Sequence, residues 1–373
     1  MFSQVLESTA QNLRFLEKSM HKPGFIFRPI HESQVQASII CSKKLGIHFR
    51  VRSGGHDFEA LSYVSRIEKP FILLDMSKLR QITVDIKDNS AWIQPGATFG
   101  ELYYRIKLVP VPETLTVFTV TKTLEQDARL KIISKWQRIA SKLIEELHIR
   151  VELRAIGNNG NKTVTMSYKG QFLGEKGTLM KVMKKAFPEL GLTQEDCIEM
   201  SWIETTLFRG GFATGSPIEV LLQLKSPLGK GYFKATSDAP FLNWTPYGGM
   251  MAKIPESEIP FPHRNRTLFK ILYQTNWPES DKRPSRHINW IKDMYSYMTP
   301  YVSSNPRQAY VNYRDLDFGQ NRNNSKVNFI EAKIWGAKYF KDNFNRLVRI
   351  KTKVDPDNFF RHEQSIPTMP VRS

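Results

Sequence analysis

The chain has 373 residues, 40% of them hydrophobic and 24% charged, a balance that excludes general disorder in a chain long enough for two domains. Lysine plus arginine number 54 against 36 aspartate plus glutamate, which gives a formal net charge of +18 and makes a polyanionic partner a question to test. Because these basic residues are spread along the chain, without a Lys/Arg block or a zinc-finger or RNA-binding motif, we expect no nucleic-acid function.

In the first third, the predicted elements form a compact α/β unit over residues 20–105. Apolar residues within 31–46 share one helical face, and Gly46 supplies a C-terminal stop. Thr98 and Glu101 have the spacing of a capping box and open a second helix. Between these helices we predict strands at 47–52 and 70–76 and an antiparallel pair at 81–86 and 91–96.

Beyond residue 106 the pattern changes to longer strands backed by helices. Residues 124–147 predict one long amphipathic helix, whose apolar stripe comprises Ala128, Ile132, Trp136, Ile139, Leu143 and Leu147. We predict further strands within 107–123, 151–157 and 163–174, helices at 177–190 and 338–356, and a strand followed by a turn at 310–319. Because no regular alternation of strand and helix is present, this part indicates a helix-backed antiparallel sheet, and the fold class is α+β.

The chain carries neither a targeting signal nor a cysteine-rich pattern in its sequence. No run of about 18 apolar residues occurs, so we expect no membrane span. The first residues lack the basic and apolar regions of a signal peptide. We expect Cys41 and Cys197 to be free buried thiols rather than a disulfide. Sequons typical of an exported glycoprotein occur at Asn161, Asn243, Asn265 and Asn323.

The motif SGGH follows directly on the strand predicted at 47–52. Gly54 and Gly55 can adopt positive φ and bring main-chain N–H groups close to an anion, which is the geometry of a diphosphate-binding loop. The alternative interpretation is a tight turn with His56 partly buried beside it. The tetrapeptide alone does not decide between the two.

Several longer stretches resemble one family. VRSGGHDFEALSYVS, FILLDMSKLRQITVD, AWIQPGATFGELYYRI, NYRDLD and DPDNFFRHEQSIP are similar to segments of the plant berberine bridge enzyme-like FAD-linked oxidases. TPYGGMMAKIPESEIPFPHR and IKDMYSYMTPYVSSNPRQAYVNYRD resemble the substrate domain of the same family. The resemblance covers nearly the whole chain.

The resemblance implies an FAD-binding domain of the vanillyl-alcohol-oxidase (PCMH) type, built from two α/β subdomains. The loop that would bind FAD comprises Arg52, Ser53, Gly54, Gly55, His56 and Asp57. His56 matches the histidine that is bonded covalently to the flavin 8α-methyl group, a link that raises the flavin potential. Tyr313 matches a tyrosine that several members use as the catalytic base, and O₂ would reoxidise the flavin.

A tyrosine base needs a neighbouring cation or a flavin contact, because its ordinary pKa is near 10. Arg314 follows Tyr313 in a predicted strand, so its side chain would point to the opposite face. Lys270 lies on the same strand face as Leu272 and is either a site-lining residue or a solvated lysine. Phe58 stands where relatives commonly have tyrosine.

The chain departs from the family pattern at Ile106 and Lys107. Relatives have a long block at this point, with the cysteine of the second flavin bond, the glycine-rich wall over the flavin and most of the second subdomain. Neither Cys41 nor Cys197 matches that cysteine. A second gap is expected within 231–249. We therefore expect an incomplete second subdomain, weakened FAD binding and exposed apolar strands.

The sequence predicts three parts of the chain and one main function. The domains are 1–106 (FAD-binding), 107–335 (substrate-binding) and 336–373 (a C-terminal segment that returns to the FAD domain). The function is FAD-dependent oxidation of a CH–OH or related donor, with a sugar, an aromatic alcohol or an alkaloid as substrate and no metal. Alternatives are a catalytically inactive remnant and a basic polysaccharide-binding protein. The family resemblance implies an extracellular or cell-wall location, and we expect Asn358 and Gln364 to be structural.

Overall fold

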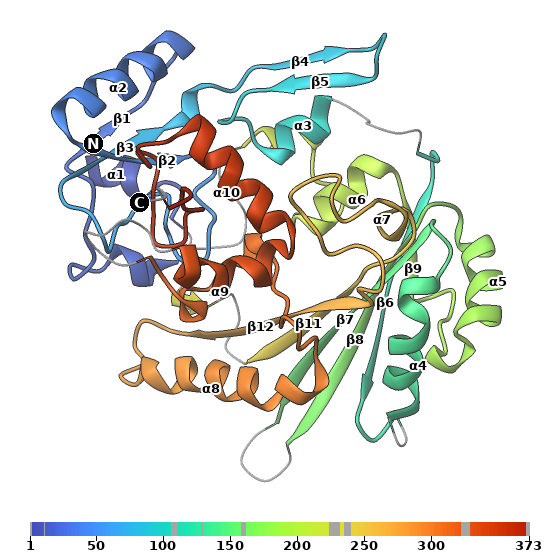
Figure 1. Cartoon of the computed structure of the whole chain (residues 1–373). Coiled ribbons are helices and arrows are strands. Elements are labelled where there is room, and N and C mark those ends of the chain that lie inside the picture. The colour runs from blue at the N-terminus through green and yellow to red at the C-terminus, as the bar shows by residue number, and fades with distance from the viewer. Residues whose placement is uncertain are drawn as a thin grey trace.

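The computed structural model describes residues 2–10, 12–105, 111–127, 130–157, 162–223, 232–234, 240–321 and 329–370. Figure 1 shows two bodies: the N-terminal strands with the two C-terminal helices on one side, and a large sheet with its own helices on the other. Among the helices described, none combines the length and the hydropathy that a bilayer crossing requires.

The first body is a small parallel sheet with covering helices. Its elements are α1 (Phe2–Glu7), β1 (Phe25–Phe27), α2 (Glu32–Leu45), β2 (His48–Arg52) and β3 (Phe71–Asp75), with the strands in the order β1-β3-β2. α2 begins after His31, whose ring accepts a hydrogen bond from the amide of Ser33, and it ends at Gly46 with φ 65°. The predicted helix at 31–46 and the strands at 47–52 and 70–76 are confirmed.

A two-stranded ribbon projects from this body. It consists of β4 (Ile82–Asp85) and β5 (Ser90–Ile93), followed by α3 (Phe99–Arg105), whose start carries the predicted capping box: the amide of Thr98 donates to Glu101 Oε2 over 2.8 Å. The ribbon has no third strand among the described residues, and Ile86 and Trp92 are 84% and 82% exposed. An isolated two-stranded ribbon is marginally stable, and exposed apolar side chains on it are typical of a surface that contacts another protein.

We expect this ribbon to promote self-association, and replacement of Trp92 by lysine to weaken it. A tryptophan buried in such a contact contributes about 2 kcal/mol, which corresponds to roughly 30-fold in the dissociation constant. Sedimentation velocity over a concentration series measures this effect. Ile334→Lys, at another exposed apolar position (62%) in the helix Phe329–Phe340, is the control. A chain that stays monomeric at all concentrations, or associates equally as Trp92→Lys, contradicts the prediction.

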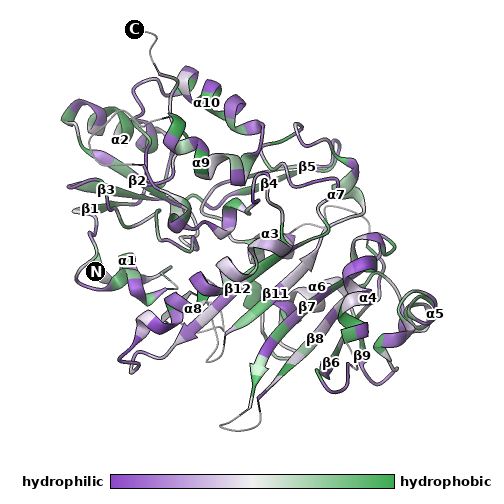
Figure 2. Ribbon diagram, turned by 60° about the horizontal axis from the view of Figure 1, so that its bottom comes forward, coloured by the Kyte–Doolittle hydropathy of each residue, from purple (hydrophilic) through white to green (hydrophobic). Residues whose placement is uncertain are grey.

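The second body is a seven-stranded antiparallel sheet, in the order β10-β12-β11-β7-β8-β6-β9. The strands are β6 (Leu115–Thr123), β7 (Leu147–Ile156), β8 (Thr163–Phe172), β9 (Cys197–Met200), β10 (Tyr232–Lys234), β11 (Phe241–Pro246) and β12 (Phe269–Trp277). Hydrophobic and hydrophilic residues alternate along β7 and β8, as expected for a sheet with one covered face (Figure 2). The predicted helix-backed antiparallel sheet is confirmed.

Helices cover the sheet and complete its core. They are α4 (Lys131–Ile139), α5 (Lys176–Ala186), α6 (Trp202–Arg209) and α8 (Pro284–Tyr297), whereas the short helix α7 (Met250–Lys253) buries no side chain. Trp136 of α4 and Leu179 of α5 are fully buried against Ile149 and Tyr168 of the sheet. The indole N–H of Trp136 donates to the carbonyl of Ile149 over 3.0 Å, which fixes α4 on β7.

The predicted helix over 124–147 is too long at both ends. Asp127 is fully buried, and its carboxylate accepts the amides of Ile132 and Ile133, so the helix starts only there. Leu147 pairs with Phe172 as the first residue of β7. The apolar stripe continued from α4 into β7 because side chains of both elements are buried in the same hydrophobic core. Ala128 of that stripe lies outside the described residues.

Two further predictions near the C-terminus are wrong. The segment 310–319 is not a strand: Val311–Tyr313 and Leu316–Phe318 are 3₁₀ turns, and the carboxylate of Asp315 accepts from the amide of Asp317. The helix predicted at 338–356 is two helices, α9 (Phe329–Phe340) and α10 (Asn343–Val354), separated at Lys341 with φ 46°.

The expectation of two free buried thiols is half right. Cys41 is exposed in α2 rather than buried, whereas Cys197 is buried; both are free.

The C-terminal segment is anchored to the first body by buried charges. Arg50 of β2 forms an ion pair of 3.1 Å with Glu363, and both side chains are buried. Arg361 bonds Glu68, and Lys43 of α2 pairs with Asp357 at the surface. α9 and α10 accordingly lie beside the N-terminal strands in Figures 1 and 2. Asn358 and Gln364 thus belong to a segment held by structural contacts.

Candidate functional site

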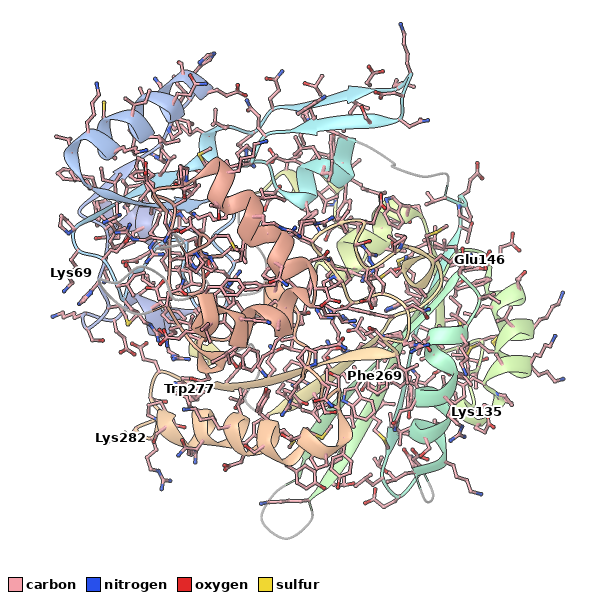
Figure 3. All side chains as sticks on the ribbon, in the orientation of Figure 1. Lys69, Lys135, Glu146, Phe269, Trp277 and Lys282 are labelled. Atoms are coloured by element: carbon pink, nitrogen blue, oxygen red, sulfur yellow. The ribbon has the colours of Figure 1, made fainter. Side chains whose placement is uncertain are left out.

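A cavity of about 1160 Å³ lies where the two bodies meet at β12. Figure 3 locates this strand by its first and last residues, Phe269 and Trp277. Its walls come from β12, from the segment 295–318 and from Phe58 and Glu59, which follow the SGGH motif. Phe58, a residue of the cavity wall, is therefore only two positions after His56 in the sequence.

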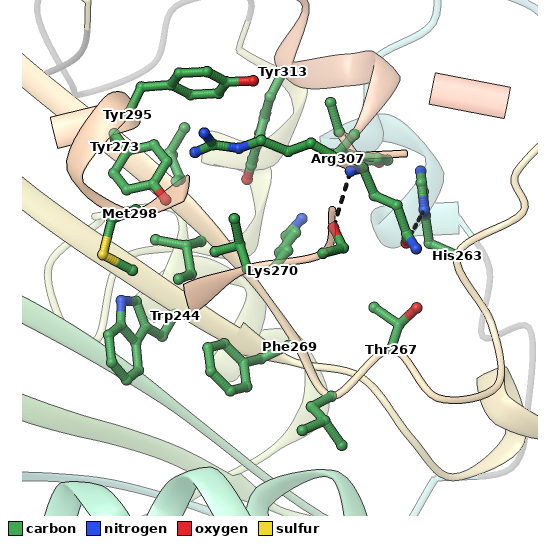
Figure 4. Close-up of a pocket in the computed structure, with 18 of the residues that line it drawn as sticks. Trp244, His263, Thr267, Phe269, Lys270, Tyr273, Tyr295, Met298, Arg307 and Tyr313 are labelled. Atoms are coloured by element: carbon green, nitrogen blue, oxygen red, sulfur yellow. Dashed lines mark hydrogen bonds between the residues drawn. The ribbon is translucent and has the colours of Figure 1, made fainter. Parts of the chain in front are cut away.

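Aromatic rings form most of one wall (Figure 4). Tyr313 packs edge-on against Tyr310 and Phe58, with ring centroids 5.1 and 5.4 Å apart. Phe58 thus takes a packing role beside Tyr313 and brings no hydroxyl to this wall. Rings at these separations make a rigid apolar surface suited to a flat organic ligand.

Lys270 lines the cavity and is not a solvated strand lysine. Its Nζ lies 4.3 Å from the ring centroid of Tyr310 and 4.6 Å from that of Tyr313. Within the described part of the chain it makes no ion pair with a carboxylate, and burial lowers its pKa. Figure 4 shows its ammonium group pointing toward Tyr313. A cation held over two phenol rings favours the phenolate form of either ring.

The pKa of Tyr313 is raised, chiefly by burial and then by Tyr310, while the positive charge of Arg150 acts in the opposite direction. The phenol is therefore protonated at neutral pH in this structure. Any role as a base depends on a further positive charge or a ligand contact, and Lys270 is the cation closest to the ring among those described.

Arg314 also lines the cavity, but its contacts are with Gln364 and Tyr339 and not with the ring of Tyr313. It is therefore a poor partner for Tyr313, as expected, although the segment is a 3₁₀ turn and not a strand. Its Nη1 donates to the carbonyl of Gln364 over 3.1 Å, and its guanidinium lies 5.6 Å from the ring centroid of Tyr339. Arg314 connects the cavity wall to the C-terminal segment.

The SGGH loop presents unpaired main-chain donors. Gly55 adopts φ 67°, and the amides of Gly54, Gly55 and His56 donate to no protein acceptor within the described residues. Ser53, Gly54 and His56 are exposed. Successive free N–H groups around a left-handed glycine form an anion-binding concavity, so these residues fit the diphosphate of a dinucleotide.

The polar side chains of the loop have partners inside the protein. Arg52 is fully buried and pairs with Asp75 over 2.7 Å, and it donates to the carbonyl of Leu6 over 2.7 Å. Ser53 Oγ bonds the carbonyl of Pro95. A contact from Arg52 to a cofactor would therefore come from its main chain.

Asp57 shapes the turn that follows the loop. Its carboxylate accepts from the amide of Leu61 and, over 2.6 Å, from Ser62 Oγ. Both bonds lie within one turn of chain, so Asp57 holds Phe58 and Glu59 at the mouth of the cavity.

As a residue His56 is exposed, but its ring is partly shielded from solvent by the protein. This partial burial lowers the pKa of His56, and Asp57 acts in the opposite direction. At neutral pH the imidazole is therefore uncharged and has a free nitrogen lone pair. This is the form that can bond to an electrophilic carbon.

Sequence reasoning missed Tyr273, Tyr295, Tyr310 and Arg307, all of which line the cavity. A signal was present, because residues 295–313 contain tyrosine at 295, 297, 301, 310 and 313. Spacing alone does not reveal that these residues meet β12.

Comparisons with known proteins bear on this geometry. A family model described as "FAD binding domain" matches residues 23–121, and one described as "Berberine and berberine like" matches residues 309–367. The chain is 65% identical to Berberine bridge enzyme-like 24 of Arabidopsis thaliana, over 99% of this chain and 88% of that protein. It is 44% identical to Monolignol oxidoreductase AtBBE-like 13 of the same plant, over 98% and 88%. The solved structure of Phl p 4, a grass pollen allergen with glucose dehydrogenase activity, is similar with a TM-score of 0.89 and 31% identity, covering 99% of this chain and 95% of that one.

The alignment with Berberine bridge enzyme-like 24 is longer than the chain itself. It spans 476 positions against 373 residues, so at least 476 − 373 = 103 positions of that relative have no counterpart here. The predicted junctions at Ile106–Lys107 and at 235–239 lie outside the described residues.

Identity of 65% over almost the full chain, two matching family models and a shared fold lead to one conclusion. The chain belongs to the berberine bridge enzyme-like family of FAD-linked oxidoreductases.

Proposed function

We propose that this chain oxidises the CH–OH group of a small aromatic alcohol, with FAD bound at the SGGH loop and O₂ as the final electron acceptor. The observation that carries this proposal is the cluster of Lys270, Tyr310 and Tyr313 in a cavity that begins at Phe58. The name of the relative Monolignol oxidoreductase AtBBE-like 13 supports an aromatic alcohol over a sugar or an alkaloid.

The loop would hold the cofactor at two points. The free amides of Gly54, Gly55 and His56 suit the diphosphate, and the neutral imidazole of His56 suits a covalent bond to the flavin. Bound FAD supplies a two-electron acceptor for a hydride. By resemblance, neither Cys41 nor Cys197 matches the cysteine of the family's second flavin bond.

The protein residues would handle the proton. Oxidation of an alcohol to a carbonyl removes one hydride and one proton, and Tyr313 Oη is the acceptor for the hydroxyl proton. To accept this proton Tyr313 must first be a phenolate, and Lys270 stabilises that negative charge until the proton arrives and the ring becomes a neutral phenol. Tyr310 and Phe58 keep the ring of Tyr313 in place and exclude water from one side.

A second candidate, a catalytically inactive remnant, is favoured by the 103 or more positions that relatives have in addition and by the exposed ribbon β4–β5. The third, a polysaccharide-binding protein, rests on the net charge of +18. Salt-sensitive retention on a polyanion column, without a flavin spectrum, supports the third candidate.

Covalent flavin separates the first candidate from the other two. We expect purified protein to be yellow, to keep its flavin spectrum after acid precipitation, and to lose the acid-stable flavin completely in His56→Ala. Absorbance of the redissolved precipitate is the measurement. Ser53→Ala is the control, because it alters the same loop without removing the imidazole. Colourless protein after incubation with excess FAD contradicts the proposal.

By family resemblance we also propose an extracellular or cell-wall location with glycosylation. Of the sequons, Asn265 is exposed, whereas the amide oxygen of Asn243 is buried in β11. Asn161 and Asn323 lie outside the described residues. A glycan is therefore expected at Asn265 rather than at Asn243.

A further inference from the structure

The cavity has a second arm on the other face of β12. Side chains alternate along a strand, so Lys270 and Tyr273 point to opposite faces and lie roughly 10 Å apart along it. Tyr273 meets Tyr295 of α8 and the segment 298–307 (Figure 4). The ring of Tyr313 instead contacts Phe58, Tyr310 and Lys270, so the residues of this arm are not needed for the proton transfer described above.

Arg307 dominates this second arm. Its guanidinium lies 3.3 Å from the ring centroid of Tyr295, and its Nη1 donates to Thr299 Oγ1 over 2.6 Å. Burial raises the pKa of Tyr273, and the charge of Arg307 acts in the opposite direction. All these partners are uncharged, and no ion pair to Arg307 is present among the described residues. A guanidinium has five N–H donors, so donors remain for a ligand.

A second cation, Lys338, does not line the cavity, but the positive charge of Arg307 acts on it. Lys338 of α9 sits 5.6 Å from the ring centroid of Phe318, and its pKa is lowered by burial and by Arg307. It too makes no ion pair within the described chain. Asp315 is a carboxylate that also lines the cavity and acts on Tyr295. Because Arg307 itself pairs with no carboxylate among the described residues, its remaining donors are open to the carboxylate of a ligand.

Resting on the proposed function, we propose that the substrate is an aryl alcohol with a carboxylate on an extended side chain, and that Arg307 binds this carboxylate. The hydroxymethyl end then lies at Tyr313 and Lys270, the ring packs along β12, and the carboxylate reaches the second arm. Arginine suits a carboxylate because its planar donors match both oxygens. A benzyl alcohol alone would reach only the first arm.

Binding of a matched pair tests the proposal without any need for flavin. The probes are 4-(hydroxymethyl)cinnamate and its neutral amide, titrated calorimetrically into the full chain. We expect the carboxylate to bind about 10- to 100-fold more tightly, the range of a charge-assisted hydrogen-bonded pair. We also expect its affinity, and not that of the amide, to fall between low and high salt.

Variants assign the effect to Arg307. Arg307→Gln is expected to abolish the preference for the carboxylate, and Arg307→Lys to retain part of it. Lys181→Gln, which removes an exposed charge on α5, is the control and should leave it unchanged.

Equal affinity of the two probes in the unmodified chain overturns the proposal, as does a preference that survives in Arg307→Gln. Galacturonate that binds as tightly as the cinnamate overturns the aromatic part. Since the titration needs no cofactor, a colourless protein that prefers the carboxylate contradicts the proposed oxidase and supports this inference.

Discussion

Replacement of Tyr313 by phenylalanine is expected to lower kcat of the flavin-loaded enzyme by about 10²- to 10⁴-fold, the range of a lost general base. The phenyl ring keeps the packing against Tyr310 and Phe58, so the protein should stay folded and keep its flavin. Stopped-flow measurement of flavin reduction by an aryl alcohol gives the rate of the chemical step. Tyr104→Phe, at an exposed position in α3, is the control.

The pH dependence of the same step provides a second readout. Burial raises the pKa of Tyr313, so the base form accumulates as pH rises and kcat/KM should increase toward alkaline pH. In Lys270→Met the phenolate loses its cation, the pKa of Tyr313 rises further, and the rising limb moves to higher pH. A rate that Tyr313→Phe leaves unchanged, or a limb that Lys270→Met does not move, argues against this base.

Replacement of Glu363 by glutamine is expected to lower the free energy of unfolding by about 3–5 kcal/mol, because it leaves the charge of Arg50 buried without its counter-ion. The C-terminal segment would then lose its attachment to β2. Urea denaturation followed by tryptophan fluorescence measures the change.

The surface pair offers a matched control in the same region. Lys43 and Asp357 also connect the C-terminal segment to the first body, but their side chains are 56% and 62% exposed. Asp357→Asn should therefore cost less than about 1 kcal/mol. Equal losses in the two variants would show that burial of the Arg50–Glu363 pair does not set its contribution.

Elements defined by local signals were predictable from the sequence. α2 follows from its apolar face and Gly46, and the start of α3 from the reciprocal bonds of Thr98 and Glu101. Helix limits set by distant contacts were not. The start of α4 depends on the buried carboxylate of Asp127, whose burial no local pattern reveals.

The site divides in the same way. The SGGH loop was visible because glycines after a strand are a local backbone signal, and its free amides agree with that expectation. The sequence alone does not decide whether Lys270 is a cavity-lining residue or a solvated lysine, because its contacts with Tyr310 and Tyr313 come from a distant segment of the chain. Arg307 was missed entirely, since its surroundings come from α8 and β12.

By itself, the sequence determined the family, the α+β class and the position of the proposed flavin loop, because motifs and periodicity are properties of neighbouring residues. Tertiary structure alone decided that residues 270, 295, 307 and 313 line one cavity and that Glu363 closes against Arg50. Such contacts join residues far apart in the chain, and their energies depend on burial, which arises only when the two bodies pack together.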